Sequence, residues 1–274
     1  MHPNFAFSAT QILWTLLFAA QLILLVVLMG RERLTRFPWF TAGVLLATLR
    51  LLCEVLLSGR VPILTLQGIL ISMADLTALV GIAVLVEIAR RAFPAASRKS
   101  WLMGAPALAL LAGVSLIYWG PWPKRADLAV DSPLALLRLM QFLGQKADLL
   151  VCLLTVGLAL LVFVFRRRFA AGCRSHASLI LIGLFSLSAV WLAITAYWQH
   201  LTHTIHPDMT REQYQQILAL GNKLFMGNRI LQIAVQLWWI ACLWFDEPGE
   251  TACAAVATGP ELPALSATTA PEEE

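Results

Sequence analysis

The stretch from Gln215 to Phe245, QQILALGNKLFMGNRILQIAVQLWWIACLWF, is long and apolar enough to cross a membrane, yet it carries polar side chains at helical spacing. These side chains are Gln215, Asn222, Arg229, Gln232 and Gln236. At about 100° per residue they share roughly one third of the circumference of a helix. Because a polar stripe is costly against lipid, we expect this face to contact protein or water.

The composition of the whole chain is that of a membrane protein. Of its 274 residues, 59% are hydrophobic and only 13% are charged, whereas soluble domains carry about 25% charged residues. Repeated apolar runs predict an all-α fold, a bundle of seven transmembrane helices that forms one domain, 1–245. The predicted spans are roughly 9–29, 37–58, 63–89, 101–119, 134–165, 177–198 and 213–245. The remainder, 246–274, has no periodicity and is predicted to be a disordered acidic tail.

The basic residues are distributed unevenly between the predicted loops. The loops after the first, third and fifth spans hold eleven Lys and Arg residues, and the opposite side holds four. Since basic loops stay in the cytoplasm, we predict a multi-pass protein of the inner membrane with its N-terminus outside and its tail in the cytoplasm. The same rule accounts for these charges without nucleic acid. The expected partners are the lipid bilayer and a cytoplasmic or membrane protein.

Ionisable side chains inside the spans are the main candidates for function. Arg50 and Glu54 are four residues apart and are expected to pair on one helical face. Most of the candidates fall in the outer half of the membrane, where an outward-facing polar cavity would use Arg50 and Arg229 to anchor a small polar or anionic ligand. The same residues can instead be buried pairs that only fix helix register. The candidate ligand or ion site comprises Arg50, Glu54, Asp75, Gln145, Asp148, Asn222, Arg229 and Gln232.

A second candidate site is the predicted outer loop before the last span. It holds His200, His203, His206 and Asp208, which have the ligand types for a divalent transition metal such as Zn²⁺, Cu²⁺ or Ni²⁺. The alternative is a polar loop that is rich in histidine by chance. We expect no other cofactor. Signatures of enzymes such as His-Glu-x-x-His, Gly-x-Ser-x-Gly and the P-loop are absent from the sequence, so we predict a protein that is not an enzyme.

Two short motifs carry a resemblance to other proteins. The FPWF motif at 37–40, which follows a short basic loop, and the VEIAR motif at 86–90 resemble a group of uncharacterised seven-helix membrane proteins of acidobacterial type. This resemblance implies a fold and no activity. The predicted topology is also similar to that of the seven-helix sensor modules of histidine kinases. We therefore expect a non-enzymatic sensory or ligand-binding module, with a small carrier or channel and a structural membrane subunit as alternatives.

Overall fold

A computed structural model describes residues 9–31, 33–92, 98–119, 133–165, 175–203 and 210–245, and every regular element in these ranges is an α-helix. Helices occur at all seven predicted positions, and a short additional helix, α2, was not predicted. The helices are α1 (Ala9–Gly30), α2 (Arg33–Arg36), α3 (Pro38–Leu57), α4 (Ile63–Ala92), α5 (Arg98–Tyr118), α6 (Pro133–Phe165), α7 (His176–His203) and α8 (Arg211–Trp244). The predicted tail, 246–274, lies outside the described residues.

Five of these helices are long and apolar enough to cross a membrane, which is the build of a multi-pass membrane protein. They are α1, α3, α4, α6 and α7. In α5, the stretch Pro106–Tyr118 is apolar. The last helix, α8, has 34 residues, but its polar side chains lower its apolar character.

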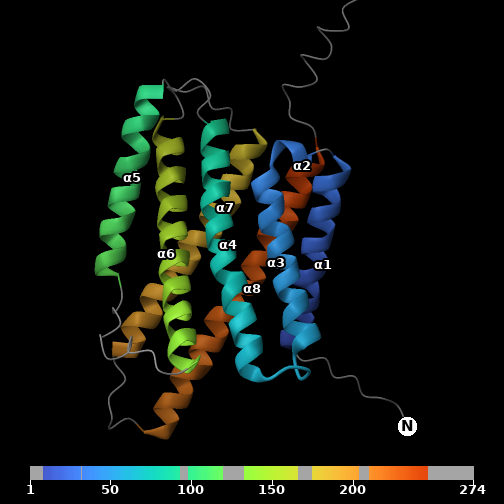
Figure 1. Cartoon of the computed structure of the whole chain (residues 1–274), viewed down its shortest axis with the longest axis vertical. Coiled ribbons are helices and arrows are strands. Elements are labelled where there is room, and N and C mark those ends of the chain that lie inside the picture. Colours follow the sequence, from blue (N-terminus) through green and yellow to red (C-terminus); the bar gives the residue numbers. More distant parts are fainter. Residues whose placement is uncertain are drawn as a thin grey trace, which may run out of the picture.

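The long helices run alongside one another (Figure 1), and their packing contacts close into a ring. Around the ring the order of packing is α1, α3, α4, α6, α7 and α8, and α8 packs again on α1. Within the described part of the chain, α5 packs only against α6, on the outside of the ring. Contacts between α4 and α7 cross the interior.

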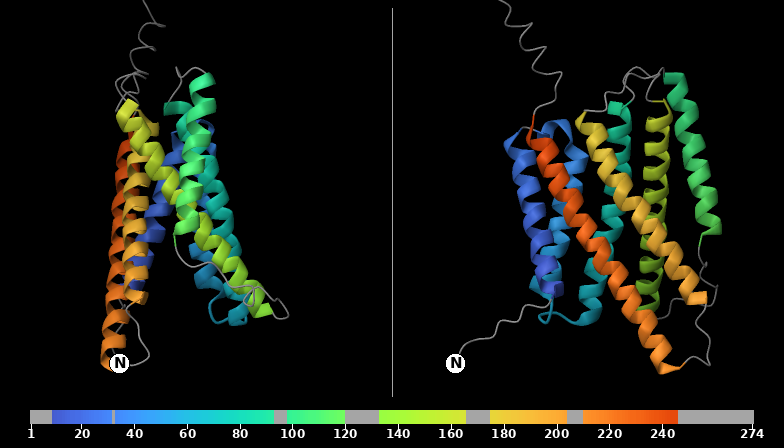
Figure 2. Two further views of the ribbon diagram at one scale, coloured as in Figure 1. Left: turned by 90° about the vertical axis from the view of Figure 1, so that its left-hand side faces the viewer. Right: turned by 180° about the vertical axis from the view of Figure 1, so that it is seen from behind.

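The apolar core lies close to one end of this ring, which we call the basic end because it carries Arg31, Arg36, Arg90 and Arg91. The largest fully buried apolar side chains come from five segments near that end: Leu24, Leu28, Phe37, Ile88, Ile180 and Leu243. Toward the opposite end, α7 and α8 diverge from α4 and α6 (Figure 2). Tight apolar packing thus holds the helices together at the basic end.

A buried carboxylate joins α3 to α4 at the basic end. The start of α3 has Pro38 at its first turn and no side-chain cap of its own. Instead, the backbone N–H of Phe40 donates to Glu87 Oε2 at 3.1 Å, and the N–H of Trp39 also bonds to this carboxylate. A negative charge at a helix N-terminus satisfies free N–H groups and complements the helix dipole.

Arg91 completes this junction from the next turn of α4. Its guanidinium lies near Glu87, donates to the carbonyl of Arg36, and covers the ring of Phe37 at 4.7 Å. We expected Glu87 to meet Arg90 or Arg91 from the sequence. The structure adds the backbone of α3 as its main hydrogen-bonding partner.

Small residues allow α7 and α8 to approach closely. Trp239 of α8 lies against Gly183, and Trp198 of α7 lies against Gly221. The ring of Trp239 also meets that of Phe40 edge to face, with 5.1 Å between centroids. These two pairs set the register of the antiparallel helices, because neither glycine position has room for a larger side chain.

Candidate functional site

Three charged side chains from three neighbouring helices come together in the ring. Asp148 of α6 interacts electrostatically with Arg50 of α3 and with Asp75 of α4. We call Arg50, Asp75 and Asp148 the charge cluster. Its members were all predicted as candidates, and the structure brings these three together although they are far apart in the sequence.

The carboxylate of Asp75 points at the backbone of α6. A Cβ atom at Gly144 would collide with Asp75 Oδ1, so glycine at this position makes room for the carboxylate. Oδ1 is fully buried and has no hydrogen-bond partner among the described residues. A buried carboxylate oxygen without a donor is energetically unfavourable, and it marks a place where a donor or a cation would be stabilised.

A further polar pair continues the charge cluster by one helical turn toward the basic end. Cys152 follows Asp148 by four residues on α6, and its thiol lies within hydrogen-bonding range of the Ser188 hydroxyl of α7. Ser188 is buried. The polar interior therefore extends across three helices of the ring, α4, α6 and α7.

The charges of the cluster do not balance among its own members, which contribute one guanidinium for two carboxylates. From the sequence we expected Arg50 to pair with Glu54, but within the described residues no such ion pair is present and Glu54 is exposed. The reason is that Arg50 acts on Asp148 of α6, which is less exposed than Glu54 and whose charge is therefore less screened by water.

Lys146 was considered as a partner for a third carboxylate, and its position is different. Its ammonium donates to the carbonyl of Leu116 at 3.4 Å and to the carbonyl of Trp119, and it lies 5.6 Å from the ring centre of Phe142. The final carbonyls of a helix carry partial negative charge. Lys146 therefore anchors the end of α5 to α6.

The polar residues of α8 are spread over several environments. Gln236 is buried, Arg229 and Gln232 are half-buried, and Gln215 and Asn222 are exposed. Within the described residues, α8 packs against α1 and α7, and it does not pack against α6, which carries Asp148. The physical reason is that α7 lies between α6 and α8 in the ring. Gln145 of α6 is exposed as well.

Asn228 is a buried polar residue that the sequence analysis missed. It lies outside the arc on which the other polar residues of α8 were grouped. Its spacing was the available signal, because Gly221, Asn228 and Val235 recur every seven residues and all three are buried. This repeat marks the face that packs against neighbouring helices.

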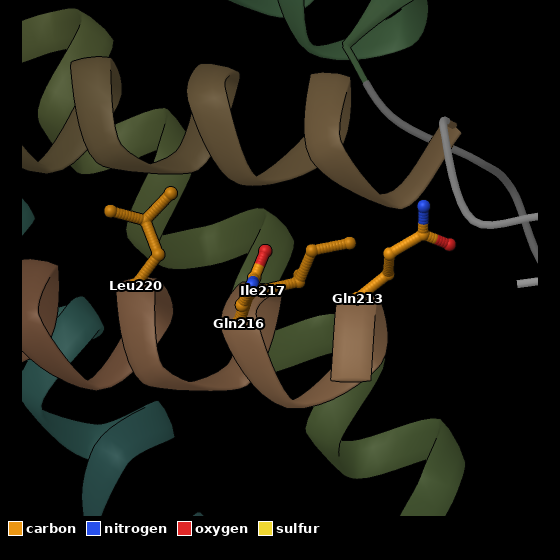
Figure 3. Close-up of a pocket in the computed structure, with 4 residues that line it drawn as sticks. All are labelled: Gln213, Gln216, Ile217 and Leu220. Carbon is orange, nitrogen blue, oxygen red and sulfur yellow. The ribbon is translucent and has the colours of Figure 1, made fainter. Parts of the chain in front are cut away.

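A shallow pocket of about 290 Å³ lies at the start of α8 (Figure 3). It is lined by Gln213, Gln216, Ile217 and Leu220, which are all residues of that one helix. A pocket formed by the side chains of one exposed helical turn offers no convergent charged groups. We therefore place the candidate site at the charge cluster and not at this pocket.

The predicted metal site falls largely outside the described residues. His200 is exposed near the end of α7, and His203 is the last residue of that helix. His206 and Asp208 lie outside the described ranges. Among the residues that are described, no group of three metal-ligating side chains comes together. The metal site stays a prediction.

Comparison with known proteins assigns no family. No family model, no curated protein and no solved structure matches the chain. The resemblance of the FPWF and VEIAR motifs therefore stays a prediction. The functional proposal below depends on the charge cluster and on the distribution of basic residues.

Proposed function

We propose that this protein is a non-enzymatic sensory or ligand-binding module of the bacterial inner membrane, and that the charge cluster is its binding site. In this proposal the chain crosses the membrane seven times, with its N-terminus outside. Two observations support seven spans. The helices α5 and α8 lie alongside the apolar helices (Figure 1), and at about 1.5 Å per residue their 21 and 34 residues are long enough to cross.

The orientation follows from charge. The basic end holds Arg31, Arg36, Arg90 and Arg91, whereas Arg60 lies in the turn at the opposite end. Placing the basic end in the cytoplasm satisfies the positive-inside rule. The charge cluster then lies nearer the outer surface than the apolar core, on the side where α7 and α8 diverge from α4 and α6 (Figure 2).

The observation that carries the proposal is the unbalanced charge of the cluster. Asp148 is near the second carboxylate, Asp75, and near one positive charge, that of exposed Arg50, and Asp75 Oδ1 has no donor among the described residues. Burial of an unpaired carboxylate is costly, so binding of a positive charge there is favoured. The sequence suggested an anionic ligand held by Arg50 and Arg229. Because the cluster holds two carboxylates and one guanidinium, we propose a cationic ligand, with the proton as the smallest candidate.

Binding can be tested without knowing the natural ligand. In detergent at constant ionic strength, replacing choline by Li⁺, Na⁺, K⁺ or ammonium, or lowering the pH, should raise the melting temperature of the wild-type protein. A cation at about 100 times its Kd contributes about 2.7 kcal/mol. The shift should disappear in Asp148→Asn and Asp75→Asn, and it should weaken in Gly144→Ala, in which a new Cβ displaces the Asp75 carboxylate.

Exposed Glu54→Gln is the matched control and should keep the shift. If no cation and no acidification raises the melting temperature, the binding proposal fails. The result would then support the alternative that this protein is a structural membrane subunit. A general salt effect would be recognised because all four variants would show it equally.

The carrier alternative is favoured by the polar pair Cys152 and Ser188, which extends the cluster inward. Reconstituted in proteoliposomes, a carrier should move the bound cation, and Asp75→Asn should abolish this flux while the protein stays folded. A sensor should bind the cation without flux and should crosslink to a cytoplasmic or membrane partner. These outcomes separate the two functions.

A further inference from the structure

Two amide side chains are buried inside the bundle without a hydrogen-bond partner. Gln21 of α1 is 6% exposed and Gln236 of α8 is 9% exposed. The side-chain oxygen of each is fully buried and accepts no hydrogen bond from any described residue. A carbonyl oxygen removed from water in this way is costly, and in a membrane-spanning segment no bulk water compensates it.

The two amides lie at a similar depth on helices that pack directly against each other. The guanidinium of Arg31 lies 5.1 Å from the ring centre of Trp244, so this contact joins the ends of α1 and α8 at the basic end. Gln21 is ten residues from Arg31, and Gln236 is eight residues from Trp244. At about 1.5 Å per residue, the amides lie about 15 Å and about 12 Å from this contact. The difference is less than one helical turn.

At this depth, the buried side chains of α8 include polar groups, whereas the buried neighbours of Gln21 on α1 are apolar. Trp239, one turn from Gln236, has a buried indole N–H with no partner among the described residues, and its nitrogen lies against Gly183 of α7. Neighbouring buried residues of α1 are apolar, such as Leu17 and Leu24. A small molecule with both donors and acceptors fits this chemistry, whereas an ion would find no charged group there.

We propose that Gln21 and Gln236 bind buried water between α1 and α8. A water molecule has two O–H donors, one for each of two amide oxygens, and its oxygen can accept from an N–H group. This site is distinct from the charge cluster and does not depend on the proposed function. It makes the contact between the first and last helices of the ring a hydrated one.

Substitution by leucine tests the site through the sign of its effect. If water is bound, Gln236→Leu removes one of its partners and leaves Gln21 unsatisfied, so the melting temperature should fall by about 3–6 °C. If each amide is simply unsatisfied, the same substitution removes an unfavourable buried group and the melting temperature should rise. Gln216→Leu, at an exposed position of α8, is the matched control and should change little.

The double variant Gln21→Leu/Gln236→Leu tests whether the two residues share their water. Its loss should be smaller than the sum of the two single losses, because no amide is then left without a partner. Additive losses would contradict a shared site.

A direct bond between the two amides would also make the single substitutions destabilising, so a second measurement is needed. Pulsed radiolysis in H₂¹⁸O, read by mass spectrometry, generates hydroxyl radicals from water next to a side chain. Buried Trp239 should acquire ¹⁸O in the wild-type protein and lose this labelling in Gln236→Leu. Exposed Tyr214 should be labelled equally in both. Absence of ¹⁸O at Trp239 in the wild-type protein would overturn the proposal.

Discussion

At the scale of single residues, the buried polar groups of this protein fall into two kinds. Some are satisfied by backbone groups of another helix, as Glu87 is by the start of α3 and Lys146 by the end of α5. Others, such as Asp75 and Gln236, present a buried oxygen that no described residue satisfies. The first kind explains how the helices are held, and the second kind indicates where something can bind.

Glu87→Ala should destabilise the protein by about 2 kcal/mol, because two N–H groups of α3 lose their acceptor and Arg91 loses its counter-charge. For a chain of this size, the melting temperature should fall by about 4–8 °C. Glu87→Gln keeps one acceptor oxygen and should lose less. Glu54→Ala, at an exposed position, serves as the control and should stay within about 0.5 kcal/mol of the wild-type protein. Equal effects of Glu87→Ala and Glu54→Ala would refute the capping role.

At the scale of helices, close approach depends on glycines that face aromatic rings. Gly183 receives Trp239, and Gly221 receives Trp198. Along α8, Phe225 lies between these two contacts. Its ring centroid lies 6.1 Å from that of Trp191 and 6.4 Å from that of Trp198. Because Trp239 also packs on Phe40, the α7–α8 pair is joined to α3 through this one side chain.

Gly183→Ala should separate α7 from α8. The new Cβ would lie 2.6 Å from Cε2 of Trp239, and this rigid buried ring has little freedom to move away. We expect a loss of about 1–3 kcal/mol, measured as a lower melting temperature. Gly227→Ala is the control, since nothing lies within 4 Å of its Cβ position, and alanine there should be neutral or slightly stabilising. A neutral Gly183→Ala would show that the ring contact does not set the helix distance.

At the scale of the whole molecule, the ring is packed unevenly. The apolar core and the Glu87 junction lie at the basic end, whereas the charge cluster lies farther from that end. Only α5 stands outside the ring in the described part of the chain. In the proposed orientation the tightly packed end is cytoplasmic and the looser end is outside. This arrangement suits the proposed binding module, because the outer half must admit a ligand while the inner half transmits the change.

The proposed topology predicts the result of reporter fusions. Green fluorescent protein fused after Phe245 should be fluorescent, because that position is cytoplasmic in the proposal. Alkaline phosphatase should be active when it is fused after Arg60, in the turn between α3 and α4, which is outside in the proposal. Fusions of each reporter at the other site should be inactive, and they provide the control. The reverse pattern would invert the orientation and place the charge cluster near the cytoplasm.

Local pattern determined where the helices lie. Apolar runs of about 20 residues predicted helices at seven positions, and at the start of α8 Thr210 and Gln213 make both hydrogen bonds of a capping box. These features depend on residues within a few turns of each other. The polar residues of the candidate site were also visible in the sequence, because charged groups inside apolar runs are rare.

Only the tertiary structure decided which of these side chains meet. Helical spacing predicted that Arg50 would pair with Glu54, but packing of α3, α4 and α6 brings both Arg50 and Asp75 near Asp148. In the same way, the packing of α8 on α1 and α7 separates its polar residues from those of α6. Sequence periodicity gives the face of a helix and not its neighbour. The neighbour is selected by contacts such as Trp239 against Gly183, in which the complementary residues are far apart in the chain.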